Sequence, residues 1–250
     1  MLNKVGQFLQ APPLRHIVGQ VKPKLDFSRI MDESSIFIAN LAKGRIGEHN
    51  AMLLGSMLMT QFFLAALRRQ DRPEQERVDF FVTIDEVHNL ASDMLGSILS
   101  EARKYHLSFT GATQYLNQLT PAIRSAIFGN VATMAVFRVG TEDAEMLESS
   151  FAPYCTPADL QTLGRHEFYV KLAIRGGGVT RPFHARALPP QSPQYRTQQR
   201  ERVIRASRER YGVRRDVIED QISRWPASTQ PMRHTSHPQQ VNERKPSIWA

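Results

Sequence analysis

The stretch from Phe80 to Leu90, FFVTIDEVHNL, constrains the fold of this chain more than any other. Its first five residues, Phe80–Ile84, favour β structure, and two adjacent carboxylates, Asp85 and Glu86, follow directly. An apolar run this short predicts a strand buried on both faces, as in a parallel sheet. Ligands of open α/β sheets collect at the carboxyl ends of the strands, which is where the two acids would lie. The stretch therefore predicts an α/β fold with a polar site beyond this strand.

An apolar strand followed by Asp-Glu is the pattern of the Walker B element of nucleoside triphosphatases. In that element the first acid holds the Mg²⁺ shell, and the second orients or deprotonates the attacking water. A plain turn at the end of a strand gives the same two residues, so the pattern alone leaves both interpretations open.

The residues that follow predict a βαβ unit. Apolar residues recur at helical spacing between Ser92 and His106, and Leu107–Thr113 is typical of a strand that ends in Gln114. Parallel strands place their carboxyl ends at one edge of the sheet. We therefore expect Gln114 beside Asp85 and Glu86.

A phosphate-cleaving site also needs a cation to neutralise developing charge. We expect the basic turn Arg103-Lys104, just before the strand that carries Gln114, to lie at the same edge. Lys104, Arg124 and Arg138 are weaker candidates for this role than Arg103. A solvated arginine on a helix surface is the competing interpretation for Arg103.

The remaining chain alternates predicted strands and helices as far as residue 187. A further buried strand is expected at 35–41, and a long helix at 48–69. We expect this helix to be buried in the fold and not to span a membrane. Thr141 and Thr156 are expected to cap helices, with Pro157 at the first position of the second one. The other expected elements are a helix at 121–128, a strand at 131–139, and a hairpin of 167–174 with 179–185 around Arg175-Gly-Gly-Gly178.

The net charge of +8 belongs mainly to the end of the chain. Residues 191–250 hold 12 Lys and Arg against 6 Asp and Glu, whereas residues 1–190 hold 20 against 18. We therefore divide the chain into a folded part, 1–187, and a basic tail, 188–250, with two short helices broken at Gly212 and a disordered end. A basic tail favours a polyanionic partner such as nucleic acid. The single cysteine, Cys155, excludes an internal disulfide framework, and we expect no zinc site.

Three blocks of the sequence resemble type IV secretion coupling proteins, the TraG/TraD-like conjugative DNA-transfer ATPases of the HerA/FtsK superfamily. The blocks are MDESSIFIANLAKGRIGEHNAMLLGSML, DFFVTIDEVHNLASDMLGSILSEARKYHLSFTGATQYLNQL and AIFGNVATMAVFRVGTEDAEMLE. The resemblance covers roughly residues 3–187 and matches the later part of the motor domain. It implies a RecA-like P-loop NTPase core with a largely parallel sheet flanked by helices, incomplete on its N-terminal side, and a C-terminal β-hairpin.

The resemblance also implies site residues and partners. Asp85 matches the aspartate that holds Mg²⁺ through water, Glu86 the catalytic glutamate, and Gln114 the glutamine that contacts the γ-phosphate of ATP. Arg103 lies where such motors present an arginine to the nucleotide of the neighbouring subunit. The implied partners are DNA, other copies in a hexameric ring, a relaxase and the secretion channel. The implied location is the cytoplasmic face of the cell membrane, reached through segments absent from this chain. Val87-His88 departs from the aromatic-Gln pair common in the family.

The phosphate-binding loop of the family, G-x-x-x-x-G-K followed by Ser or Thr, occurs nowhere in the 250 residues. The chain is thus expected to be the later part of a longer motor and to hydrolyse ATP poorly alone. The alternatives are a non-catalytic DNA-binding or adaptor subunit with a degenerate motor fold, and a DNA-packaging motor of the same superfamily.

Overall fold

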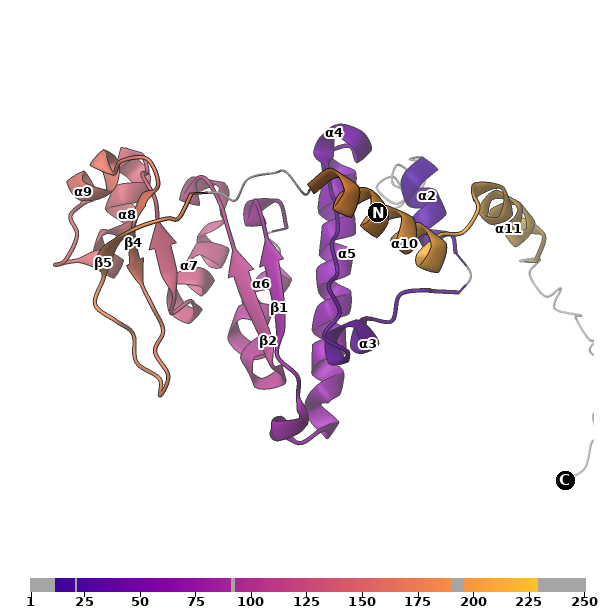
Figure 1. Cartoon of the computed structure of the whole chain (residues 1–250), viewed down its shortest axis with the longest axis horizontal. Coiled ribbons are helices and arrows are strands. Elements are labelled where there is room, and N and C mark those ends of the chain that lie inside the picture. The colour runs from indigo at the N-terminus through magenta and orange to yellow at the C-terminus, as the bar shows by residue number, and fades with distance from the viewer. Residues whose placement is uncertain (1–11, 21, 91–92, 190–195, 229–250) are drawn as a thin grey trace, which may run out of the picture.

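The computed structural model describes residues 12–20, 22–90, 93–189 and 196–228, and shows a mixed α/β fold (Figure 1). The predicted α/β class is therefore confirmed. The helices are α2 Pro12–Val18, α3 Phe27–Asp32, α4 Lys43–Ile46, α5 Glu48–Leu67, α6 Asp93–Glu101, α7 Pro121–Asn130, α8 Thr141–Phe151, α9 Pro157–Thr162, α10 Arg196–Tyr211 and α11 Arg215–Ser228. The strands are β1 Phe80–Ile84, β2 Leu107–Gly111, β3 Met134–Val136, β4 Glu167–Lys171 and β5 Phe183–Arg186.

The described strands form two sheets that differ in direction. β1 and β2 are parallel, with Phe80 opposite Leu107 and Ile84 opposite Gly111, and α6 connects them. This is the predicted βαβ unit. β3, β4 and β5 form a separate antiparallel sheet, in which β4 and β5 are the predicted hairpin. Only the first sheet is parallel, so a largely parallel sheet is not what these residues form by themselves.

Helices cover the β1–β2 pair on one face. Phe80 and Ile84 of β1 are buried, but Phe81 is 71% exposed and Thr83 is also exposed. The prediction that this strand is buried on both faces is therefore wrong. The alternation arises because successive side chains of a strand point to opposite faces, and the core lies on only one of them.

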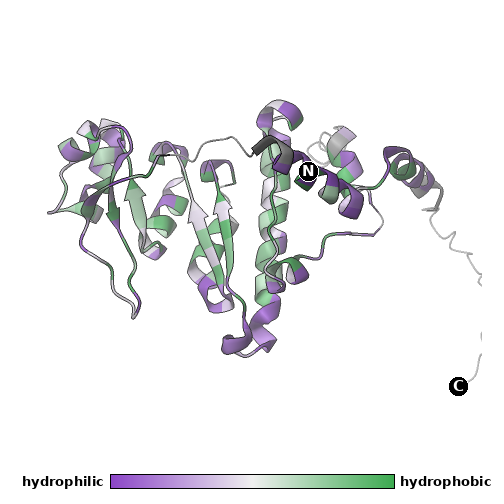
Figure 2. Cartoon of the chain, viewed as in Figure 1, coloured by the Kyte–Doolittle hydropathy of each residue, from purple (hydrophilic) through white to green (hydrophobic). Residues whose placement is uncertain are grey.

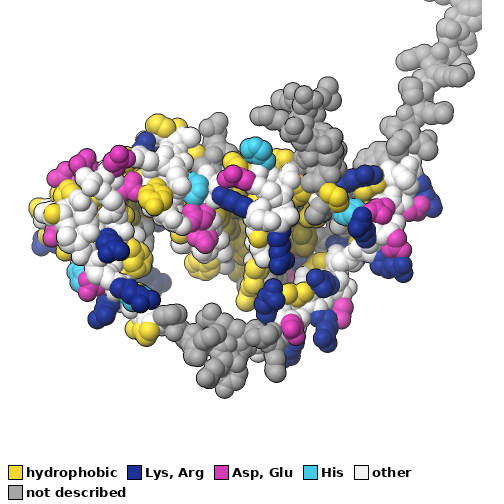
Figure 3. Space-filling model, turned by 90° about the horizontal axis from the view of Figure 1, so that it is seen from above, with side chains coloured by type: hydrophobic (Ala, Val, Ile, Leu, Met, Phe, Trp, Pro, Cys, Tyr) yellow, Lys and Arg dark blue, Asp and Glu magenta, His cyan; other side chains and the backbone are white. Residues whose placement is uncertain are grey.

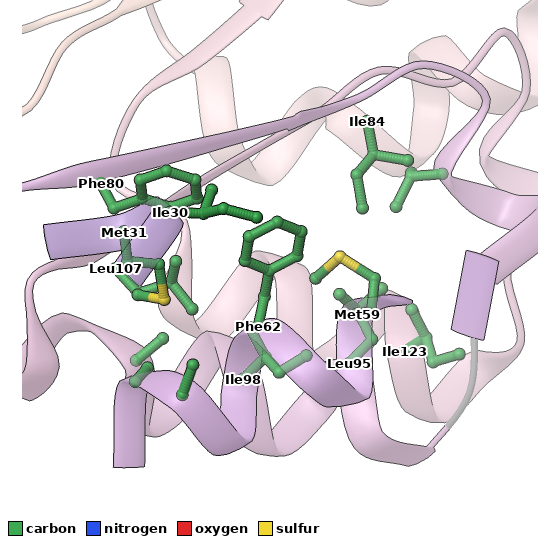
Figure 4. Packing of buried hydrophobic residues seen from close by; sticks show 14 of the residues in the cluster. Ile30, Met31, Met59, Phe62, Phe80, Ile84, Leu95, Ile98, Leu107 and Ile123 are labelled. Atoms are coloured by element: carbon green, nitrogen blue, oxygen red, sulfur yellow. The ribbon is translucent and has the colours of Figure 1, made fainter. Parts of the chain in front are cut away.

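The main core lies between the first sheet and helices α5 and α6. Figure 4 shows Phe62 and Met59 of α5 reaching toward Phe80 and Ile84 of β1. The rings of Phe62 and Phe80 stack with centroids 5.4 Å apart. Leu95 and Ile98 of α6 complete this core, as their helical spacing predicts.

The helix over Glu48–Asp71 is long and apolar enough to cross a membrane by length and composition, and 33% of its most apolar window is buried. Met59, Phe62 and Ala66 on one of its faces belong to the core. Within the described residues it is the one such helix.

The predicted strand at 35–41 is not a strand. This segment runs extended beside α5 without pairing to β1, and Ile36 and Ile38 are 91% and 77% exposed. Phe37 packs on the core, against Phe27 and Phe62. Apolar content predicted an element here, whereas a strand also requires a neighbour that takes its backbone hydrogen bonds.

A buried arginine links the segments that lead into β1 and β2, at the amino ends of these strands. Arg69, only 3% exposed, binds Asp32 of α3 through Nε and Nη2 at 3.1 and 2.9 Å. Its Nη1 donates to the carbonyls of Val78 and Tyr105. One guanidinium thus ties α3, the end of α5, and the approaches to β1 and β2.

A second core lies beneath the antiparallel sheet, with Phe151 and Leu160 fully buried. Thr156 and Asp159 form a capping box at α9, as predicted for Thr156. Thr141 is not the cap of α8 but its first residue, because Gly140 occupies the cap and the Thr141 hydroxyl donates to Gln161.

Cys155 is buried in this second core. Burial raises the pKa of its thiol to about 11, which keeps it neutral and unreactive near pH 7.

The tail forms the two predicted helices, α10 and α11, separated around Gly212. Figure 2 shows both as largely hydrophilic, in contrast to β1 and α5. α11 packs on α2, where Ile218 is buried and the Cβ that an alanine would place at Gly19 would lie 2.7 Å from Cδ1 of Ile222. The tail therefore returns to the start of the described chain. The expected disorder at 226–247 falls mostly outside the described residues, and α11 continues to Ser228.

Candidate active site

Glu86 and Gln114 meet at the carboxyl ends of the two parallel strands. Gln114 Nε2 donates to Glu86 Oε1 at 2.6 Å. The two residues are 28 positions apart in sequence, and the parallel register of β1 and β2 brings them together. The predicted convergence of Gln114 with the Asp85-Glu86 pair is thus what the structure shows.

Backbone hydrogen bonds fix the two loops that carry these side chains. Ala112 N donates to Ile84 O at 2.9 Å, and Val87 N donates to Ala112 O at 2.8 Å. Val87 packs against Gly111, where an added Cβ would lie 3.4 Å from the Val87 side chain. The two strand ends are therefore held together as one unit.

Glu86 occupies a backbone conformation that non-glycine residues rarely adopt. Its φ is +54°, in the left-handed region. Its carbonyl accepts hydrogen bonds from the backbone and side-chain amides of Asn89, both at 3.0 Å. Strained backbone of this kind concentrates at functional sites, because the surrounding contacts must hold it.

The second carboxylate oxygen of Glu86 has a partner that sequence reasoning missed. His88 Nδ1 lies 3.3 Å from Glu86 Oε2 and 3.3 Å from Thr113 Oγ1. The His88 side chain is 15% exposed and that of Glu86 32%. The positions of His88 two residues after Glu86 and of Thr113 beside Gln114 are the only sequence signal for this contact.

Asp85 is exposed beside Glu86. Its Oδ1 accepts from the backbone N–H of Glu86 at 3.1 Å, and its Oδ2 has no hydrogen-bond partner among the described residues. Mg²⁺ in nucleotide sites is usually held by one or two carboxylates together with water and phosphate oxygens. One exposed carboxylate fits that mode of binding. No cluster of three or more His, Cys, Asp or Glu in the described part of the chain could form a complete metal cage.

A cavity of about 620 Å³ opens beside the two acids. Its walls are the extended segment 37–42, Lys43 at the start of α4, one face of α5, and the free edge of β1. Most of the lining is apolar, while Asp85, Glu86, Asn40 and Lys43 are among its polar residues. Lys43 Nζ also binds Glu48 at 3.2 Å. Space therefore adjoins the acids on the side of β1 away from β2.

The expectation that Arg103 and Lys104 share this edge is wrong. They lie in the 3₁₀ turn Ala102–Tyr105, immediately before β2. A residue just before a parallel strand lies at its amino end, and Gln114 follows the carboxyl end. β2 therefore separates Arg103 from the Glu86 site within one chain.

Of the weaker cation candidates, Arg124 contacts the segment that follows Gln114. Its Nη1 donates to Asn117, in the loop that follows Gln114, at 3.1 Å. Asp143 of α8 anchors the same loop by accepting from Leu116 N at 3.2 Å. Arg138 is exposed after β3 and has no ion-pair partner among the described residues.

No family model and no curated protein matches this sequence. Among solved structures, similar ones include the bacterial conjugative coupling protein TrwBdeltaN70, with a TM-score of 0.47 and 16% identity over 58% of this chain. TrwB bound to the non-hydrolysable GTP analogue GDPNP gives a TM-score of 0.44, with 15% identity over 56% of this chain. The genome packaging NTPase B204 from Sulfolobus turreted icosahedral virus 2, bound to AMPPCP, gives 0.44 with 13% identity. That match covers 66% of this chain and 73% of the viral protein.

The chain spans about two fifths of the length of the TrwB chains, 39% and 38%. These TM-scores are below 0.5, and the identities do not exceed 16%. Over part of its length, the chain is similar in structure to conjugative coupling proteins and to a packaging NTPase.

Proposed function

We propose that this chain is the carboxyl-terminal part of an ATP-driven, DNA-translocating motor of the coupling-protein type. The contact between Glu86 and Gln114, 2.6 Å across the ends of two adjacent parallel strands, carries this proposal. It supplies a base and a polar group at the edge of an α/β sheet where ligands bind.

In this proposal each side chain has one task. Glu86 accepts a proton from the water whose oxygen attacks the γ-phosphorus of ATP, and ADP leaves as the bond from the γ-phosphorus to the bridging oxygen breaks. Gln114 leaves Glu86 to donate to a γ-phosphate oxygen. Asp85 would hold Mg²⁺ through water, and the ion would neutralise charge on the phosphates.

We propose that DNA is the substrate that this motor translocates. Arg200, Arg202, Arg205 and Arg208 of α10 are exposed and have no ion-pair partner among the described residues. Figure 3 shows dark-blue side chains gathered at the end of the molecule where α10 and α11 lie. Unpaired arginines on an exposed helix are suited to contact the phosphate backbone of DNA.

The fuller proposal is a hexameric ring at the cytoplasmic face of the membrane that passes DNA from a relaxase to a secretion channel. In such a ring Arg103 would serve the nucleotide of a neighbouring subunit.

The phosphate-binding loop must come from outside these 250 residues. Sequencing the coding region that precedes Met1, followed by ATPase assays on the encoded longer protein, tests the proposal. We expect an in-frame G-x-x-x-x-G-K-[ST] loop and DNA-stimulated hydrolysis. Glu86→Gln should lower kcat by about 10²- to 10⁴-fold. Glu74→Gln, at an exposed glutamate in a 3₁₀ turn, is the matched control and should leave kcat unchanged.

Residues 1–250 alone should release phosphate from ATP at the background rate. A Glu86-dependent rate from this fragment would contradict the account of the missing loop. A longer protein that binds DNA but hydrolyses no ATP would instead favour the adaptor subunit.

A further inference from the structure

The imidazole of His88 contacts the Glu86 carboxylate and the Thr113 hydroxyl through the same atom. Nδ1 lies 3.3 Å from Glu86 Oε2 and 3.3 Å from Thr113 Oγ1. Thr113 Oγ1 itself donates to the carbonyl of Tyr115 at 3.2 Å. The hydroxyl hydrogen is therefore already used, and Thr113 can only accept from His88.

An ionised carboxylate also only accepts. Both neighbours of His88 Nδ1 are therefore acceptors, so Nδ1 must carry a proton. The Nδ1–H group is shared between Glu86 and Thr113. When His88 is neutral, these hydrogen bonds therefore select its Nδ1–H tautomer, opposite to the Nε2–H form that free neutral imidazole side chains prefer.

The two oxygens of Glu86 then have different partners. Oε1 accepts from Gln114 at 2.6 Å, and Oε2 faces His88. Gln114 is exposed, whereas His88 is largely buried beside Thr113. The Gln114 contact can be exchanged for a ligand without repacking, but the His88 contact cannot.

We infer that His88 is a positioning residue, which holds the Glu86 carboxylate through Oε2 while Gln114 releases Oε1. This inference rests on the proposed function for its catalytic consequence. When Gln114 turns to the phosphate, His88 keeps Glu86 in place and Oε1 becomes free to accept the proton of water. Thr113 fixes the ring from the neighbouring strand end.

The tautomer of His88 can be read directly by ¹⁵N NMR of the 250-residue chain labelled at histidine nitrogen. We expect an Nδ1–H signature for His88, assigned by its loss in His88→Asn. His49, which is exposed and has no side-chain hydrogen bond or ion pair among the described residues, is the control and should show Nε2–H. Glu86→Ala combined with Thr113→Val should return His88 to Nε2–H. Nε2–H in the unmodified chain, or Nδ1–H that persists in the double variant, would overturn the inference.

The catalytic consequence is measured in the longer ATP-hydrolysing protein. His88→Leu should lower kcat by about 10- to 100-fold with KM unchanged, since a misplaced base slows the step without altering binding. His88→Asn keeps a side-chain N–H near the position of Nδ1 and should restore most of kcat. If Glu86→Gln abolishes hydrolysis and His88→Leu does not affect it, the role of His88 is wrong. If Glu86→Gln itself has no effect, the proposed function is wrong, and the NMR result still decides whether His88 holds Glu86.

Discussion

Glu86 combines a strained backbone with a side chain bound at both oxygens. Its φ of +54° would be ordinary for glycine and is unfavourable for glutamate. The contacts to Gln114, His88 and Asn89 hold the residue in this conformation. Stability is thus given up at the one position where the proposed mechanism places its base.

This strain can be measured with a matched pair of variants. Glu86→Ala and Glu86→Gly both remove the side-chain contacts, but only glycine relieves the left-handed backbone. We expect Glu86→Gly to be more stable than Glu86→Ala by about 1 kcal/mol in urea unfolding. Equal or lower stability of the glycine variant would show that the backbone is not strained there.

At the scale of elements, the segments that lead into β1 and β2 are held by one buried guanidinium, that of Arg69. Arg69 makes two contacts to Asp32 and two to backbone carbonyls, whereas Arg72 binds the other oxygen of Asp32 at 2.8 Å from a half-exposed position. The two arginines share one acid and differ in burial.

Replacing these arginines should separate the effect of burial from that of charge. Arg69→Met should cost about 3–5 kcal/mol, because it leaves the carbonyls of Val78 and Tyr105 without their donor and Asp32 half-paired. Arg72→Met should cost about 0–1 kcal/mol, as exposed ion pairs do. Chemical denaturation of the two variants and the unmodified chain is the measurement, and similar losses for both would refute the distinction.

At the scale of the whole molecule, α11 returns the basic helices to α2. The approach of Ile222 to Gly19, together with the contact from His16 to Glu219 at 3.2 Å, defines this closure. α10 is exposed along most of its described length, and its arginines face solvent. A tail fixed in this way presents its charge at a defined place.

DNA affinity should depend on these arginines and on salt. Arg205→Ala with Arg208→Ala should reduce the slope of log affinity against log salt by roughly 1–2, because each lost phosphate contact removes about one released counterion. Arg29→Ala with Arg72→Ala removes the same charge from sites already paired with acids, and should change the slope little. Fluorescence anisotropy with labelled DNA over a salt series gives both slopes. Affinity that does not fall with salt would argue against phosphate contacts.

The sequence predicted those parts of the structure that depend on local pattern. The β1–α6–β2 unit, the hairpin, the cap at Thr156 and the break at Gly212 each follow from spacing, proline, glycine or polar residues within a few positions. The meeting of Gln114 with Glu86 also followed, because parallel strands bring their carboxyl ends to one edge. By the same rule Arg103, which precedes β2, lies at the opposite end of that strand.

What the tertiary structure alone decided are the contacts between residues that no local pattern relates. The amino-acid order gives the strand tips and the acids on them, but the partners of Glu86 beyond Gln114 depend on how two loops pack. His88 reaches Thr113 across 25 positions, and the apolar run at 35–41 remains unpaired because no neighbouring strand in the described chain accepts it. Hydrogen bonds and burial require a second group at a specific place, and only the folded chain determines which group stands there.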